Sequence, residues 1–61
     1  MSQLSEKELS AIGELLSEEE LLIKKFQMLA TQTTDDKIKT EFEAIADKHQ
    51  GHFNDLYSHL N

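Results

Sequence analysis

Three residues in this sequence, Glu19, His49 and His52, are of types that bind metal ions. His49 and His52 lie three residues apart, so on a helix both imidazoles point to the same side. Each of the three stands in a stripe that is otherwise apolar. Cysteine is absent, which leaves imidazole nitrogen and carboxylate oxygen as ligands, a set that suits zinc, iron(II) or manganese. The pattern therefore predicts a metal site made by Glu19, His49 and His52.

The same residues have a metal-free interpretation. A His-x-x-His pair is more often hydrogen-bonded than metal-bound, and one of the three consecutive glutamates at 18–20 faces inward by chance. A hydrogen bond between Glu19 and His49 would satisfy both groups, whereas burying either without a partner would be costly. A metal site and a hydrogen-bonded pair both stay open at this point.

The element that must position Glu19 is a helix expected over residues 5–31. Ser5 and Glu8 have the spacing of a capping box, in which each side chain bonds the other's backbone N–H at the start of a helix. Apolar residues then recur at helical spacing. They are Leu9, Ile12, Leu16, Ile23, Phe26 and Ala30. Glu19 fills the gap of two turns between Leu16 and Ile23.

A second helix, expected over residues 35–60, must position the histidines. Residues 31–34 are threonine and glutamine and predict a tight turn, and Asp35 and Asp36 suit the start of the next helix. The stripe of this helix is Ile38, Phe42, Ile45, His49, His52, Leu56 and Leu60. A short connection makes the helices antiparallel neighbours, which places Glu19 level with about residue 47, within one turn of both histidines.

The fold class expected is all-α: one antiparallel two-helix hairpin spanning residues 1–61. A chain of 61 residues without disulfides needs further support, and two helices cannot cover such wide apolar stripes. We therefore expect a homodimer that forms a four-helix bundle, with two glutamates and four histidines in its core. The alternative is that the hairpin packs on a different partner.

Composition argues against several classes of function. Six basic against twelve acidic residues give a net charge of −6, which disfavours nucleic acid and anionic membranes as partners. No apolar run has transmembrane length, and the N-terminus lacks the apolar core of a signal peptide, so a cytoplasmic location is expected. No nucleophile motif or Gly-rich phosphate loop is present. The sequence favours a protein that is not an enzyme.

Two segments, LLSEEELLIKKFQMLA and KTEFEAIADKHQGHFNDLYSHL, resemble the small ferritin-like spore coat proteins of the coat F type. The likeness covers roughly residues 4–60. Glu19 matches the family's glutamate ligand in its first helix, and His52 matches the histidine of its Glu-x-x-His motif. His49 stands where the family has the glutamate of that motif. A bridging carboxylate holds two metal ions close together in such bundles. This departure therefore favours zinc or a single ion over a di-iron centre, or else marks a bundle that kept the scaffold and lost the metal chemistry.

The resemblance implies a structural or assembly role in spores, with other spore coat proteins as further partners and a location in the cytoplasm or the spore. The alternative function is the binding of zinc, iron or manganese by a Glu/His site in the dimer core, which is also a candidate for redox activity.

Overall fold

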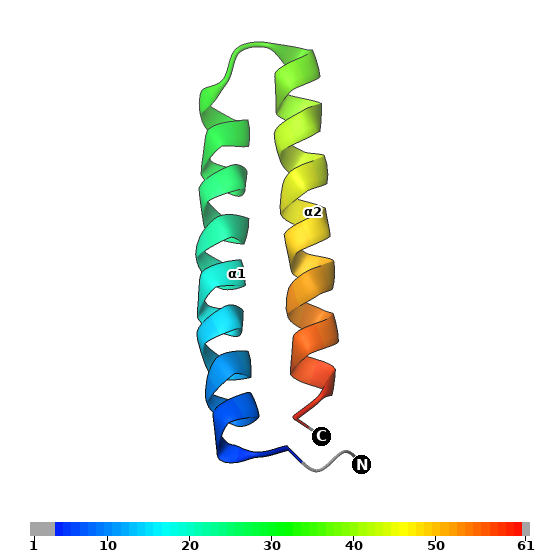
Figure 1. Cartoon of the computed structure of the whole chain (residues 1–61). Helices are drawn as coiled ribbons and strands as arrows, with labels where there is room; N and C mark the ends of the chain where they lie inside the picture. The colour runs from blue at the N-terminus through cyan, green and yellow to red at the C-terminus, as the bar shows by residue number, and fades with distance from the viewer. Residues whose placement is uncertain (1–3, 61) are drawn as a thin grey trace.

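The computed structural model describes residues 4–60, which form an antiparallel hairpin of two helices (Figure 1). Helix α1 spans Glu6–Gln32 and helix α2 spans Asp36–Ser58. The helices lie side by side along the 46 Å length of the molecule. The expected all-α antiparallel hairpin is thus confirmed. The expected domain also included residues 1–3 and 61, which lie outside the described residues.

Helix α1 begins with the capping box that the sequence predicts. The N–H of Glu8 donates to the Ser5 hydroxyl oxygen over 3.1 Å, and the N–H of Ser5 donates to Oε1 of Glu8 over 2.9 Å. The bond from the Ser5 N–H, and secondly the Ser5 side chain, hold the pKa of the Glu8 carboxyl below its ordinary value. Both ends of α1 lie one residue later than the expected 5–31. Glu19 is the middle residue of the observed helix.

The connection to α2 consists of three residues, 33–35. Asp35 caps the second helix, since its carboxylate accepts the N–H of Ile38 over 2.9 Å. The expected end at residue 60 is too late, because α2 ends at Ser58. After Ser58 the backbone hydrogen bonds reach back three residues, as in a 3₁₀ turn. The N–H of His59 donates to the Leu56 carbonyl, and the N–H of Leu60 donates to the Tyr57 carbonyl.

The contact between the helices buries little of the chain. Within residues 4–60, Ile23, Ala30 and Ala46 are the buried residues. Ile23 and Ala30 come from the expected stripe of the first helix, but the stripe of the second is rotated. Ala46 and Phe53 turn toward α1, whereas three members of the expected stripe are exposed. These are Ile38, His52 and Leu60.

The partial coverage of the apolar stripes has a simple cause. In a hairpin each helix faces one neighbour, so about half of a wide apolar stripe is covered and the other half stays open. The less covered half is here called the open face. Its exposed residues are Leu15, Ile38 and His52, and its half-buried residues are Leu22, Leu29 and Ile45. Within residues 4–60 no helix is apolar enough over a sufficient length to cross a membrane.

Candidate metal centre

The structure brings Glu19, His49 and His52 together as the sequence predicts, in what we call the Glu/His cluster. Nδ1 of His49 lies 2.6 Å from Oε1 of Glu19, across the two helices. Nδ1 of His52 lies 3.5 Å from Oε2 of the same carboxylate. One ligand atom from each residue can be chosen so that all three lie within 4.8 Å of one another. Two imidazoles thus approach the two oxygens of one carboxylate.

The three side chains differ in their access to water. Glu19 and His49 are partly buried, with 17% and 21% of the side chain exposed, whereas His52 is 58% exposed. The cluster therefore begins in the contact between the helices and opens onto the open face at His52. An ion could reach it from that side without any movement of the helices.

A second observation concerns Phe26, whose role the sequence does not reveal by residue type. Its ring lies against the imidazole of His49, with centroids 6.0 Å apart and planes inclined by 17°. Phe26 also contacts the ring of Phe42 on α2. A signal was present in the spacing, because Phe26 follows Glu19 by seven residues and thus lies on the same side of α1.

Two distances in the cluster are close to the separation of neighbouring ligand atoms around a metal ion. Zinc bonds of about 2.0–2.1 Å in tetrahedral geometry place neighbouring ligand atoms roughly 3.3 Å apart. The two nitrogen–oxygen distances, 2.6 and 3.5 Å, lie on either side of that value. Because the three ligand atoms lie within 4.8 Å of one another, binding would also require side-chain rotations that bring them closer together. Nδ1 of His49 would exchange its proton for the ion, as metal ligation by imidazole requires.

The hydrogen-bonded alternative accounts for only part of this arrangement. His49 donates to Glu19, and this bond alone satisfies both groups. It does not explain why His52 directs Nδ1 at the other oxygen from 3.5 Å, a distance too long for a strong hydrogen bond. A metal ion would account for both imidazoles, and so would an ion pair between a protonated His52 and Glu19 beside the Glu19–His49 hydrogen bond. His52 is therefore the residue that separates the two interpretations.

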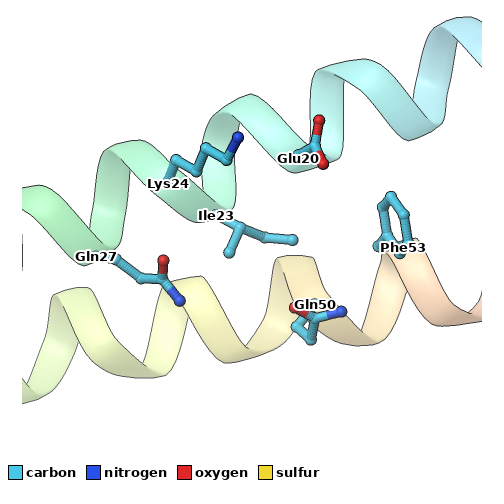
Figure 2. A pocket seen from close by; sticks show the side chains of 6 residues that line it. All are labelled: Glu20, Ile23, Lys24, Gln27, Gln50 and Phe53. Carbon is cyan, nitrogen blue, oxygen red and sulfur yellow. The ribbon is translucent and has the colours of Figure 1, made fainter.

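The opposite side of the hairpin has a different character. A groove of about 330 Å³ runs there, bordered mainly by polar side chains of both helices. Its lining residues are Glu20, Ile23, Lys24, Gln27, Gln50 and Phe53. Figure 2 shows Ile23 and Phe53 directed into the space between the helices. No member of the Glu/His cluster lines this groove, so the cluster belongs to the apolar side of the molecule.

Comparison of the chain with models of protein families, with curated proteins and with solved structures finds no match.

Proposed function

We propose that this hairpin binds a divalent transition metal ion through Glu19, His49 and His52. The observation that carries the proposal is the approach of two imidazole nitrogens to the two oxygens of a single, mostly buried carboxylate. The charge of Glu19 then compensates the ion, and the ion compensates a carboxylate that is largely withdrawn from water.

The ligand set favours zinc, with iron(II) and manganese as weaker candidates. Two imidazoles and one carboxylate form a known zinc ligand set, and the same set binds iron(II) in non-haem enzymes. Three protein ligands leave at least one coordination position for water or for a ligand from another chain. His49 supplies nitrogen where the resembled family has an oxygen ligand, which moves the preference further toward zinc.

Metal analysis of the purified protein tests this proposal. The protein is produced without a His-tag and without added metal, and its metal content is measured by mass spectrometry. We expect a transition metal in proportion to the chain, and a stabilisation by added Zn²⁺ of about 2.7 kcal/mol at a hundredfold excess over Kd. A content below about 0.1 equivalents, together with no shift of the unfolding temperature on adding Zn²⁺ or Fe²⁺, would contradict a site of ordinary structural-zinc affinity.

A second candidate function is structural assembly without catalysis, which is the role implied by the resemblance to coat F-type spore proteins. The open face and the small number of buried residues favour it, because a chain with so little core gains stability by burying apolar surface on a partner. The first partner we propose is a second copy, which would complete a four-helix bundle. Other spore coat proteins are the alternative partners.

Sedimentation at micromolar concentration tests the second candidate. A homodimer has twice the 7.0 kDa mass of the chain. We expect that mass when the metal site is loaded. A stable, folded and metal-loaded monomer would instead contradict self-assembly and direct attention to a different partner.

A further inference from the structure

The open face has the sequence pattern of a helix-packing interface. On α1, Leu15, Leu22 and Leu29 recur every seven residues, and on α2 Ile38, Ile45 and His52 do the same. A seven-residue repeat keeps these side chains on one side of each helix. Leu15 and Ile38 are 44% and 42% exposed, although both are large and apolar. Such a face is unfavourable in water and is suited to packing against two further helices.

The dimensions of the face fit a second hairpin. The hairpin measures 46 by 17 Å, hence roughly 800 Å² for one side, which is the area that each partner buries in an interface of standard size. The occupant must also accept a polar layer, since Glu19 and His52 lie halfway along the face. A second copy offers the same layer at the same level, whereas an apolar partner would cover the exposed His52 without offering it a polar group.

Because the Glu/His cluster lies halfway along the hairpin, the clusters of two paired copies face each other for either direction of the two-fold axis. If the two-fold axis runs parallel to the helices, every residue keeps its level, so the clusters of the two copies face each other. If the axis runs across the helices, the faces overlap fully only when it passes the middle of the hairpin. Glu19 is the middle residue of α1, so the clusters again meet.

Charges beside the open face distinguish these two arrangements. Glu18 and Lys25 follow Leu15 and Leu22 by three residues, and Glu41 and Lys48 follow Ile38 and Ile45 by three. All four are exposed. The contacts Glu19–His49 and Phe26–Phe42 place Glu18 within about half a turn of the level of Lys48, and Lys25 likewise near the level of Glu41.

Stacking α1 of one copy over α2 of the other preserves these levels and brings opposite charges together at both positions. In the other arrangement, a two-fold axis crosses the helices at the level of Glu19 and α1 lies over α1 of the second copy. Glu18 is then more than one helical turn away from Lys25 of the second copy. Charge complementarity thus favours the arrangement in which each α1 lies over the α2 of the other copy, with the two-fold axis parallel to the helices.

We propose that two copies pair through the open face in this arrangement, and that metal binding at the facing Glu/His clusters strengthens the pairing. The inference rests on the proposed metal site. Without an ion, pairing buries two Glu19 carboxylates near each other, and their repulsion and desolvation oppose it. A divalent cation shared by the two facing clusters would neutralise both carboxylates and so offset both costs. Dimerisation is then linked to metal by mass action.

The first test measures metal binding and association separately, with Zn²⁺ as the probe. Equilibrium dialysis gives zinc bound per chain, and analytical ultracentrifugation gives mass with Zn²⁺ or with EDTA. For wild-type protein we expect a dimer with Zn²⁺ that dissociates at least roughly tenfold more readily in EDTA. Zinc binding to a protein that remains monomeric would overturn the pairing and leave the metal site standing. A dimer of equal strength in both conditions would overturn its linkage to metal.

A pair of matched variants locates the interface. The double variant Leu15→Gln and Ile38→Gln changes the open face, and both residues are already exposed in the hairpin, so its fold should persist. The control is Leu21→Gln and Met28→Gln, which changes two residues of the outer side of α1 that are 68% and 51% exposed. We expect the first variant to bind zinc as a monomer and the control to dimerise as wild type. The reverse result would place the interface on the other side.

A charge exchange tests the arrangement of the helices. Lys48→Glu should weaken the zinc-loaded dimer roughly tenfold, because it converts two attractive contacts into repulsive ones. Adding Glu18→Lys to the same chain should restore the dimer and return the net charge to that of wild type. If the double variant binds zinc but does not regain association, the arrangement in which α1 lies over α2 of the second copy is excluded.

Discussion

The aromatic ring of Phe26 lies nearly parallel to the imidazole of His49, at a centroid distance of 6.0 Å. Phe26 comes from α1 and His49 from α2, so the stack joins the two helices beside the Glu19–His49 contact. We infer that the ring restricts the rotation of the imidazole and thereby helps to keep Nδ1 directed at Glu19. We interpret Phe26 as a positioning residue of the proposed metal site.

Replacing Phe26 by leucine should therefore weaken metal binding without removing a ligand. We expect zinc affinity to fall roughly tenfold, the lower end of the range for residues that orient ligands. Isothermal titration of Phe26→Leu measures this. Phe42→Leu is the matched control, because the ring of Phe42 pairs with Phe26, whereas the imidazole of His49 pairs with Phe26 and His52. Equal losses of affinity in both variants would show that Phe26 acts through general stability alone.

The sequence predicted most of the fold because its signals agreed with one another. The capping box at Ser5 and Glu8, the aspartates before the second helix and the helical spacing of apolar residues each point to the same two helices. The convergence of Glu19 with His49 and His52 followed from the short turn, which fixes the antiparallel register. The contact of Glu19 is His49, two residues beyond the level expected.

The spacing of apolar residues does not show which part of a wide apolar stripe packs against the other helix and which part stays exposed. His52 and Phe53 are neighbours, and both fit an apolar side of α2. Burial against α1 selects Phe53 and leaves His52 exposed, and this outcome depends on the rotation of α2 about its axis. The stacking of Phe26 on His49 depends on the same rotation, which is set by packing of side chains such as Ala46.

Changing His49 to glutamate should alter metal preference. The variant offers two carboxylates and one imidazole, a ligand set that suits manganese and iron(II) better than the wild-type set does. We expect the ratio of Mn²⁺ to Zn²⁺ affinity to rise, as measured by competition titration. Without metal, repulsion between Glu19 and the new carboxylate should lower the unfolding temperature, and metal should restore it. An unchanged ratio would indicate that residue 49 is not a ligand.

The capping box gives a prediction for pH dependence. The pKa of Glu8 is lowered in the folded state, so its stabilising contribution is present above the ordinary carboxyl pKa and is lost as pH falls through the lowered value. Glu8→Gln removes this titration. Urea unfolding from neutral to acidic pH should therefore show a smaller acid-induced loss of stability in the variant. Glu6→Gln, in the same helical turn, serves as control and should keep the wild-type loss.

Loss of the cap itself should be visible at neutral pH. Ser5→Ala removes the acceptor for the N–H of Glu8 and should cost about 1 kcal/mol in the free energy of unfolding. Urea denaturation measures this difference. Since Ser5 is far from the Glu/His cluster along α1, zinc affinity should not change. A change in affinity larger than the loss of stability explains would contradict the independence of cap and site.

Gly51 should be replaceable with a gain in stability. It lies within α2, and a Cβ added there meets no atom within 4 Å. Gly51→Ala should therefore stabilise the protein by about 0.5–1 kcal/mol through helix propensity. Thermal unfolding tests this, with zinc affinity expected to equal that of wild type. A loss of stability would mean that this side of α2 contacts a second chain.

The comparison of His52→Gln with His59→Gln tests the central claim most directly. His59 lies seven residues after His52, at the end of α2 and outside the Glu/His cluster, while the Glu19–His49 hydrogen bond is retained in both variants. By zinc titration, we predict that His52→Gln lowers affinity by more than the roughly 100-fold range of orienting residues, whereas His59→Gln binds as wild type. Equal zinc affinity in wild type and both variants would contradict a metal site at this cluster.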